Sequence, residues 1–322
     1  DNDSQYAKCR RETAPMTAPI AIFAYNRPDH LERLAHSLER CNGFADSPVI
    51  IFSDGAKGEE DLADVQAVRS LVSGLGWGNL ELVASNVNKG LKRSISEGVS
   101  ATVARYGRVI VLEDDLHLSR VALDYFNAAL DKYAMEPRVW SVSGYMYDVP
   151  QLRERKSAFF LPFAQSWGWA TWERAWSRFD PDEHLPDDVL ASHSFRDAFS
   201  MNGTSDFANM LQMSRDGYIS SWFIRWYFKI FSEGGVSLFP PATFISNSGV
   251  SGGSGTHAGR FNPYDLLVKP RLPLETMVQL PDRVVIDFKA MDAIPRSWEA
   301  SVLRFNHAAG SLKRKLKRSL GM

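Results

Sequence analysis

The chain has 322 residues, of which 44% are hydrophobic and 23% charged, and its formal net charge is −1 at pH 7. This composition is typical of a globular protein, and the near-neutral charge argues against whole-protein attraction to nucleic acid. Two cysteines, Cys9 and Cys41, provide no disulfide framework, so a reducing compartment is expected. No apolar run approaches the roughly 20 residues of a membrane-spanning helix.

The first half of the chain alternates strand-like and helix-like segments. Short apolar runs predict strands at residues 20–25, 48–52, 80–84 and 109–112; helices are predicted between and after them, at 28–41, 59–75, 91–105 and 119–133. This order predicts an α/β fold with a mostly parallel sheet and right-handed crossovers. The first strand is not followed by Gly-x-Gly-x-x-Gly, and there is no P-loop motif, which argues against a dinucleotide-binding domain and a P-loop enzyme.

The second half is richer in tryptophan and less regular. Strands are predicted at residues 139–143, 158–161, 236–239 and 243–246, and helices at 169–179, 206–215 and 222–233. A glycine-rich segment at 248–259 reads as a mobile lid or a disordered tether. We expect a flexible tail at 1–18, one domain at 19–260 with halves at 19–135 and 136–260, and an extension at 261–322.

The apolar run at 109–112 ends in three acids, Glu113, Asp114 and Asp115. Such a run predicts a central strand covered on both faces, and ligands of open α/β sheets lie beyond the carboxyl ends of such strands. Three carboxylates in that place repel one another and are costly to desolvate. A divalent cation bound together with a phosphate would remove this cost. The alternative is a strand end that turns acidic in solvent.

Polar residues follow all four predicted parallel strands, at 25–28, 53–55, 86–90 and 113–115, and can therefore converge on one crevice. This combination resembles the nucleotide-sugar-binding half of GT-A glycosyltransferases. The Leu-Glu-Asp-Asp form, with the later Gly168 and Trp169, most resembles the N-acetylglucosaminyltransferase type I branch and its bacterial relatives. The resemblance covers about residues 19–259.

The resemblance implies a role for several residues in holding the donor. Tyr25 and Arg27 would hold the uracil and phosphate side of the nucleotide sugar, and Asp54 would contact its nucleobase or ribose. Lys89 and Arg93, in the first turns of a helix, would suit a diphosphate. The alternatives are a turn residue for Asp54, a surface salt bridge for Arg27 and a solvated helix face for Lys89 and Arg93.

The same resemblance makes Asp115 the direct ligand of Mn²⁺ or Mg²⁺, within a motif that includes Glu113 and places Asp114 near the ribose. His257, late in the sequence, would bind the metal or the diphosphate. The alternative is an exposed loop residue. Trp167 would flank the donor sugar, with core packing as the alternative.

An inverting transfer needs a general base, and here the pattern departs from the family. Relatives carry Asp-Ser-Trp where this chain has Ser220-Ser221-Trp222. They also carry Asp at the position of Ser251. The departure puts both the identity of the base and the activity in question. Asp216 is the first substitute by sequence proximity, followed by Asp206 and Glu173.

Arg225 interrupts an apolar helix, so it is expected to pair either with the diphosphate or with a core acid. The remaining histidines show no metal-ligand spacing and are interpreted as structural or surface residues; they are His30, His36, His117, His184 and His193.

The resulting prediction is a metal-dependent glycosyltransferase that moves a sugar from a UDP-sugar, UDP-GlcNAc by resemblance, to a hydroxyl acceptor on a glycan or lipid-linked molecule. The alternatives are a glycosyltransferase-like binding protein without chemistry and a sugar-phosphate nucleotidyltransferase. The polar start carries no signal-peptide pattern, so a cytoplasmic location is expected. The basic segment at 311–320 predicts peripheral contact with an anionic membrane, or a solvated basic end.

Overall fold

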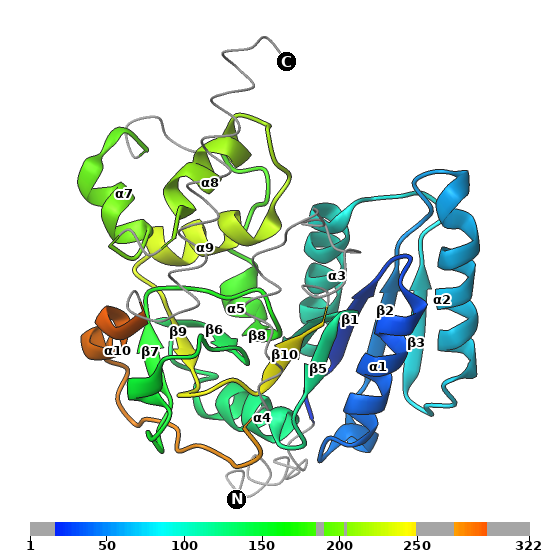
Figure 1. Cartoon of the computed structure of the whole chain (residues 1–322), viewed down its shortest axis with the longest axis horizontal. Coiled ribbons are helices and arrows are strands. Elements are labelled where there is room, and N and C mark those ends of the chain that lie inside the picture. The colour runs from blue at the N-terminus through cyan, green and yellow to red at the C-terminus, as the bar shows by residue number, and fades with distance from the viewer. Residues whose placement is uncertain (1–16, 185–189, 203–204, 249–273, 295–322) are drawn as a thin grey trace, which may run out of the picture.

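The computed structural model describes residues 17–184, 190–202, 205–248 and 274–294. Eight strands form one sheet in the order β3-β2-β1-β4-β8-β6-β9-β7, and β10 pairs with β5 in a separate two-stranded ribbon (Figure 1). The strands of the large sheet are β1 Ile20–Ala24, β2 Val49–Ser53, β3 Leu80–Ala84, β4 Arg108–Glu113, β6 Val139–Ser143, β7 Phe159–Leu161, β8 Trp169–Trp172 and β9 Val236–Phe239. The predicted α/β class, with a mostly parallel sheet flanked by helices, is confirmed.

The first half is the parallel part of the sheet. β1 pairs in parallel with β2 and β4, and β2 pairs in parallel with β3. The connecting helices are α1 Pro28–Glu39, α2 Leu62–Gly74 and α3 Leu91–Tyr106, and α4 Ala122–Lys132 follows β4. The chain thus moves outward from β1 to β3 and then returns to the other side of β1, which makes the gap between β1 and β4 a topological switch point.

The second half extends the same sheet with mixed pairing. β8 runs antiparallel to both β4 and β6, β6 runs parallel to β9, and β7 closes the edge antiparallel to β9. The prediction of a helix over residues 169–179 is wrong, because Trp169–Trp172 is strand β8 and only Glu173–Trp176 is helical, as α5. Short apolar runs do not distinguish the two states by periodicity, and here the open edges of β4 and β6 accept a strand.

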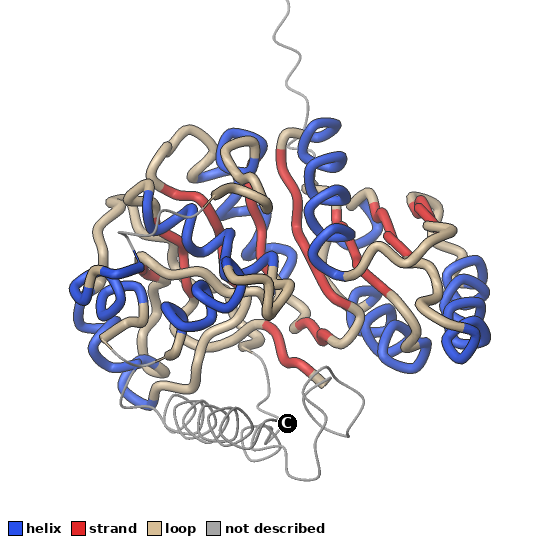
Figure 2. Tube along the Cα trace, turned by 90° about the horizontal axis from the view of Figure 1, so that it is seen from above, coloured by secondary structure: helices blue, strands red, loops and turns tan. Residues whose placement is uncertain are grey.

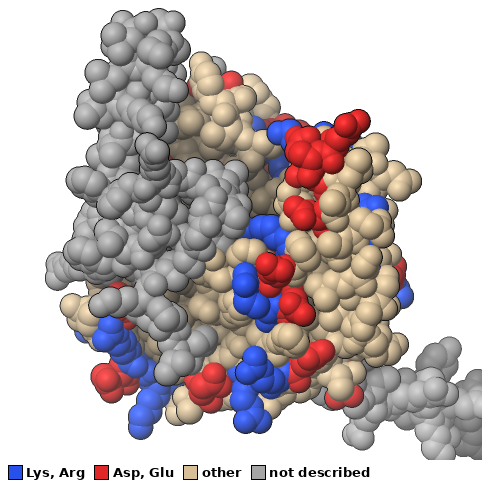
Figure 3. Space-filling view, turned by 45° about the vertical axis from the view of Figure 1, so that its right-hand side comes forward, with Lys and Arg blue, Asp and Glu red and all other residues tan. Residues whose placement is uncertain are grey.

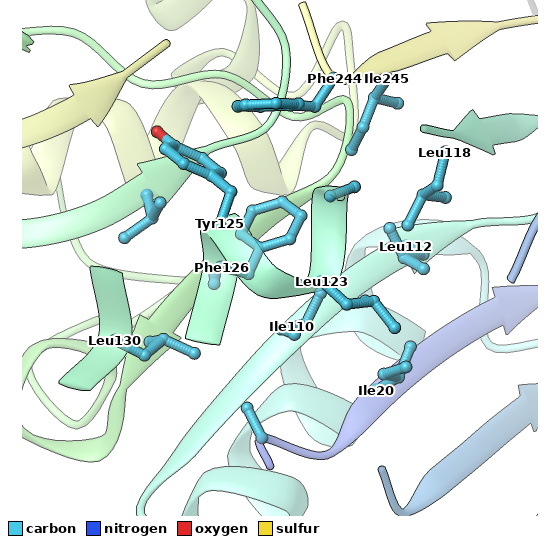
Figure 4. Packing of buried hydrophobic residues seen from close by; sticks show 14 of the residues in the cluster. Ile20, Ile110, Leu112, Leu118, Leu123, Tyr125, Phe126, Leu130, Phe244 and Ile245 are labelled. Carbon is cyan, nitrogen blue, oxygen red and sulfur yellow. The ribbon is translucent and has the colours of Figure 1, made fainter. Parts of the chain in front are cut away.

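Two hydrophobic cores lie on opposite faces of the sheet. One contains α1, α2 and α4, and the other contains α3, α5 and α9 (Trp222–Ser232). Figure 2 shows the strands between the helices, and Figure 4 shows Ile110 and Leu112 of β4 on the side of the sheet that Leu123 and Phe126 of α4 cover. The run Val109–Leu112 is at most 1% exposed, so the predicted central strand, covered on both faces, is confirmed.

The remaining elements lie around this frame. The helices α7 (His193–Phe199), α8 (Phe207–Arg215) and α9 gather at one end of the molecule, away from β2 and β3 (Figure 1). β5 (Leu116–Leu118) pairs antiparallel with β10 (Ile245–Asn247). Short helices complete the described elements: η1 Phe44–Asp46, η2 Glu59–Asp61, η3 Pro150–Leu152 and α10 Phe288–Ala293.

Part of the predicted extension returns to the domain. Within the segment 274–294, Val278 and Val284 join the first core and Ala290 and Ile294 join the second. The predicted membrane-surface segment at 311–320 and most of the glycine-rich segment lie outside the described residues. None of the helices in the part that the structure describes combines the length and apolar composition needed to cross a bilayer.

Gly168 allows β8 to enter the sheet beside the end of β4. Its φ of +65° lies in the left-handed region, and a Cβ atom there would meet Cδ1 of Ile245 at 2.0 Å. Its carbonyl oxygen also accepts a hydrogen bond of 2.8 Å from the backbone N–H of Gly144. Only glycine satisfies both the backbone conformation and the close approach.

We predict that Gly168→Ala lowers the free energy of unfolding by about 2–4 kcal/mol, because it adds overpacking to left-handed strain. Urea denaturation measures the loss. Gly76→Ala is the matched control, since Gly76 has a φ of +67° but no atom within 4 Å of the added Cβ. The control should lose about 1 kcal/mol. Equal losses in the two variants would show that the contact with Ile245 carries no cost.

Candidate functional site

The three acids of the central strand lie at the topological switch point. In the β1–β4 pairing Phe23 stands opposite Glu113, so the residues that follow β1 and those that end β4 emerge side by side. The turn after β1 contains Tyr25, Asn26 and Arg27, and the turn after β4 contains Asp114 and Asp115. The structure therefore brings together these predicted donor-binding and metal-binding residues.

Arg27 bridges two of the acids. One guanidinium nitrogen, Nη2, donates to Oδ1 of Asp114, and the other, Nη1, donates to Oδ2 of Asp115 at 3.2 Å. The side chains of Arg27, Asp114 and Asp115 are only 23%, 2% and 13% exposed. This largely buried bridge differs from the surface salt bridge that the sequence left open for Arg27.

Burial dominates the electrostatics of the acid cluster. It raises the pKa of Glu113 to about 8, and the charges of Asp115 and Asp114 add to the effect. Burial likewise raises the pKa of Asp114 to about 7, against the opposing influence of Arg27. One guanidinium therefore does not compensate for three carboxylates, and further positive charge at this edge would be stabilising.

The carboxylate of Asp115 is the candidate ligand for a cation. Its Oδ1 is buried and has no hydrogen-bond partner among the described residues, whereas its backbone oxygen accepts from the N–H and the hydroxyl of Ser248 at 2.8 and 3.0 Å. Among the residues described, no group of three or more His, Cys, Asp or Glu side chains is arranged to hold a metal. The donor set fits a hard cation such as Mn²⁺ or Mg²⁺, which can bind one carboxylate and complete its shell with water and substrate phosphates. His257 lies outside the described residues.

Asp54 holds a turn of the backbone. It is 7% exposed and accepts hydrogen bonds from the N–H groups of Gly55, Lys89 and Gly90 at 2.8, 2.8 and 2.9 Å. These bonds form the loop that begins α3, in keeping with the turn role that the sequence left open. Arg69 supports the arrangement by donating to the backbone oxygens of Asp54 and Ser85, and nothing in the sequence had marked it.

The predicted diphosphate-binding cations pair with one acid on the face of α3. Lys89 and Arg93 bind Glu97 at 2.7 and 2.6 Å, and Glu97 is 43% exposed. This is the solvated helix face of the alternative interpretation. Figure 3 shows the same pattern in general on the face that it displays, where Lys and Arg side chains lie next to Asp and Glu side chains. Such exposed pairs are weak, so a phosphate could compete for both cations.

Tyr25 and Asn26 tie the loop after β2 to the end of β1. The hydroxyl of Tyr25 donates to Asp61 at 2.5 Å and accepts from the N–H of Lys57, and the amide of Asn26 donates to Asp61 at 2.7 Å. Burial and the bond to Asp61 raise the pKa of Tyr25 to about 12. Tyr25 is therefore a neutral hydrogen-bond donor that holds the loop after β2 beside the acids.

Trp167 lies beside the end of β4. Val111 pairs with Trp169, so Trp167 and Gly168 emerge next to the acids. The ring of Trp167 is half-buried and meets Tyr145 edge to face, with ring centroids 4.6 Å apart. Tyr145 was not among the residues predicted from the sequence.

The residues considered as general bases lie in different places. Glu173 follows β8, and its N–H donates to the oxygen of Gly107 at the start of β4, so the length of that strand separates it from Asp115. Asp216 is an exposed residue at the end of α8 and accepts from Gln212 and Arg215. Asp206 precedes α8 and accepts from Asn209 at 3.0 Å.

Ser220 is exposed in the loop between α8 and α9, and the next residue, Ser221, caps α9 by accepting from the N–H of Ile224. Trp222, at the start of α9, stacks on Trp169 with ring centroids 5.2 Å apart. This contact places the start of α9 on the face of the sheet that carries α3, beside the start of β8. Arg225 donates to Ser214 and to the backbone oxygen of Glu183, so it joins α9 to neighbouring segments.

Two histidines interpreted as structural or surface residues lie near Asp115. The Nδ1 atom of His30 is 3.1 Å from the hydroxyl of Ser248, which itself binds the backbone of Asp115. Burial lowers the pKa of His30 and of His117, and the charge of Asp115 acts on both imidazoles. His30, His117 and Ser248 are far apart in the sequence, so no sequence pattern predicts that they lie close together.

No protein-family model and no curated protein matches the chain. Solved structures do match at low similarity. One is a mannosyltransferase from Pyrobaculum calidifontis in complex with GDP-Man and Mn²⁺, at 14% identity and a TM-score of 0.38, over 68% of this chain and 70% of that one. Another is the galactosyltransferase LgtC with donor and acceptor sugar analogues, at 12% identity and a TM-score of 0.36, over 68% and 72% of the two chains.

A third match is a putative glucose-1-phosphate thymidylyltransferase from Bacillus anthracis, at 13% identity and a TM-score of 0.31, over 53% of this chain and 77% of that one. None of the three is an N-acetylglucosaminyltransferase, so the predicted resemblance to that branch gains no support from them.

We predict that Arg27→Met lowers the free energy of unfolding by about 3–5 kcal/mol at pH 8, because it leaves Asp114 buried without its partner. The raised pKa values mean that the folded state holds the protons of Glu113 and Asp114 more tightly than the unfolded chain does. Stability therefore falls as the pH rises through this range, and the loss in Arg27→Met should shrink at pH 5.5, where the acids are protonated.

Urea denaturation of both proteins at the two pH values measures this effect. Arg93→Met is the control, since Arg93 is 68% exposed in its pair with Glu97 and should lose far less at either pH. A pH-independent loss in Arg27→Met would contradict the assigned charge balance.

Proposed function

We propose that this protein is a metal-dependent glycosyltransferase, which moves a sugar from a UDP-sugar to a hydroxyl group of a glycan acceptor. The observation that carries the proposal is the buried Oδ1 of Asp115 at the switch point of the sheet, which has no hydrogen-bond partner in the part of the chain that the structure describes. A carboxylate oxygen left without a partner is costly, and a cation that also binds a diphosphate would relieve the cost.

The residues around Asp115 suit the departing nucleoside diphosphate. A bound Mn²⁺ or Mg²⁺ would neutralise charge on the diphosphate as the glycosidic bond breaks. Asp115 would hold that ion, with His257 as the predicted second ligand. Arg27 sits beside the same carboxylates and would orient a phosphate oxygen, because its planar guanidinium suits such groups.

The remaining donor contacts follow from the neighbouring strand ends. Lys89 and Arg93 would exchange Glu97 for the diphosphate. Tyr25 would line the part of the site that holds the uracil. Asp54 would act through the loop that it holds, by fixing the N–H groups that begin α3. Trp167 would pack on the donor sugar, since aromatic faces suit the C–H surfaces of sugars.

The general base would come from the loop between α8 and α9. Ser220 occupies the position where the family pattern has an acid, and Asp216 is the nearest carboxylate along that loop. A base on this loop would take the proton of the acceptor hydroxyl, which attacks the anomeric carbon while the UDP leaves with its electron pair. Inversion of configuration is part of the proposal.

The two alternatives make different demands on the chain. A nucleotidyltransferase commonly has a glycine-rich phosphate loop after its first strand, whereas this chain has Tyr25-Asn-Arg-Pro28 there. A binding protein without chemistry would hold UDP and Mn²⁺ but transfer no sugar, and the serine at 220 favours this candidate over the nucleotidyltransferase.

We predict that Asp115→Asn removes the enhancement of UDP binding by Mn²⁺ and leaves the fold intact, because the amide keeps the shape of the carboxylate but not its charge. Calorimetric titration of UDP with and without Mn²⁺ measures the change. A parallel titration of GDP tests which nucleobase the site prefers. Asp131→Asn is the control, since Asp131 pairs with Arg108 on a different part of the surface. Mn²⁺-enhanced binding that persists in Asp115→Asn would defeat the metal role.

The missing acid yields a second prediction. If Ser220 stands at the base position, sugar transfer is slow in the natural chain, and Ser220→Asp should raise it by roughly 10²- to 10⁴-fold. UDP affinity should stay unchanged, because the base acts on the acceptor. If Asp216 is the base instead, Asp216→Asn should abolish transfer and Ser220→Asp should change little. A fully active Asp216→Asn protein with no gain from Ser220→Asp would rule out both residues.

A further inference from the structure

Aromatic side chains continue the row of strand ends beyond the acids. β8 begins at Trp169, which pairs with Ser143 at the end of β6. Trp167, two residues before β8, and Tyr145, two residues after β6, therefore emerge at the same edge of the sheet as Asp115. Their rings meet at an interplanar angle of 71°, and Tyr147 packs edge to face on Tyr145 with ring centroids 5.7 Å apart.

The pair Tyr145–Trp167 lies where the two cores meet. Trp167 packs against the core that contains α1 and α4, whereas Tyr145 packs against the core that contains α3 and α9. Because the sheet separates these cores, two rings in contact from opposite cores must sit on the rim of the sheet. Both residues are half-buried, so each packs on its core and remains partly exposed.

The backbone under the pair is well supported. The N–H of Gly144 donates to the oxygen of Gly168, and the hydroxyl of Ser143 donates to the oxygen of Tyr145, each at 2.8 Å. Ser143 also accepts from the N–H of Tyr145 at 3.2 Å. Rings held in this way lose little conformational freedom when they bind a ligand, which favours a preformed binding surface.

The position of Tyr145 suits an acceptor sugar. β4 and β6 are separated only by β8, so Tyr145 is about 10 Å, or two strand spacings, along the edge from Asp115. This span leaves room for one transferred sugar between the diphosphate and the acceptor. Trp222 and Tyr145 also pack against the same core, so the loop that carries Ser220 lies on the side of the sheet where Tyr145 lies.

We propose that Tyr145 is the platform of the acceptor subsite, that it stacks on the C–H face of a hexopyranoside, and that Trp167 is the wall shared with the donor sugar. This inference rests on the proposed function for its reaction, but sugar binding by Tyr145 can be tested separately. A pyranoside has an apolar C–H face and a hydroxyl rim, and such a face packs on an aromatic ring while the hydroxyls stay solvated.

Saturation-transfer NMR on the full chain tests the subsite, with methyl β-galactopyranoside and methyl β-glucopyranoside as probes in the presence of UDP and Mn²⁺. The expected result is transfer concentrated on the C–H protons of one face of at least one probe. Tyr145→Ala should weaken that binding by about 2- to 13-fold, the scale of an aromatic contact, and Tyr145→Phe should retain it. Tyr106→Ala is the control, because Tyr106 is a half-buried tyrosine at the end of α3, next to the start of β4.

Titration of UDP with Mn²⁺ on the same proteins separates this inference from the proposed function. Normal UDP binding with no transfer to either probe, or with equal probe binding in Tyr145→Ala, overturns the subsite and leaves the donor site intact. Probe binding that depends on Tyr145 without UDP binding supports the subsite and overturns the glycosyltransferase. If Tyr145→Ala does not fold, saturation transfer in the wild-type protein decides. Transfer to the probe that is stronger when aromatic protein protons are irradiated than when aliphatic ones are supports the subsite. Weaker transfer from the aromatic protons overturns it.

Discussion

The candidate site depends on the guanidinium of Arg27. A central strand buried on both faces delivers its last residues into surroundings of low dielectric constant, and in this chain those residues are acids. Arg27 comes from the neighbouring strand end and shares its charge between Asp114 and Asp115. Since Tyr25 and Asn26 in the same turn hold Asp61, and Ser248 holds the backbone of Asp115, three separate loops are positioned around this one cation.

The parallel half of the fold was readable from the sequence because each of its strands is a short apolar run between helices of ordinary length. The predicted and observed strands agree within a residue or two at both ends. The second half was less readable, since the partners of β8 are distant in the chain and its residues Trp169–Trp172 carry no strand periodicity. β5 is only three residues long, and its pairing with β10 spans more than a hundred residues of sequence, so no local pattern could reveal it.

The site was predictable to the extent that strand order alone determines it. Residues directly after β1 and β4 had to meet, and they do. Side-chain partners were not predictable in the same way, because Asp54 turned its carboxylate to backbone N–H groups and Lys89 turned to Glu97. Arg69, His30 and Tyr145 were missed because their importance comes from contacts with residues far away in the sequence.

The pairing of β4 with β8 has a consequence for how the molecule can be divided. Four residue pairs, from Arg108 opposite Trp172 to Val111 opposite Trp169, join the two halves through the middle of one sheet. A fragment ending after α4 would expose the open edge of β4, and an exposed edge pairs readily with other chains and aggregates. The halves should therefore unfold as one cooperative unit, and neither is a module that recombination could exchange on its own.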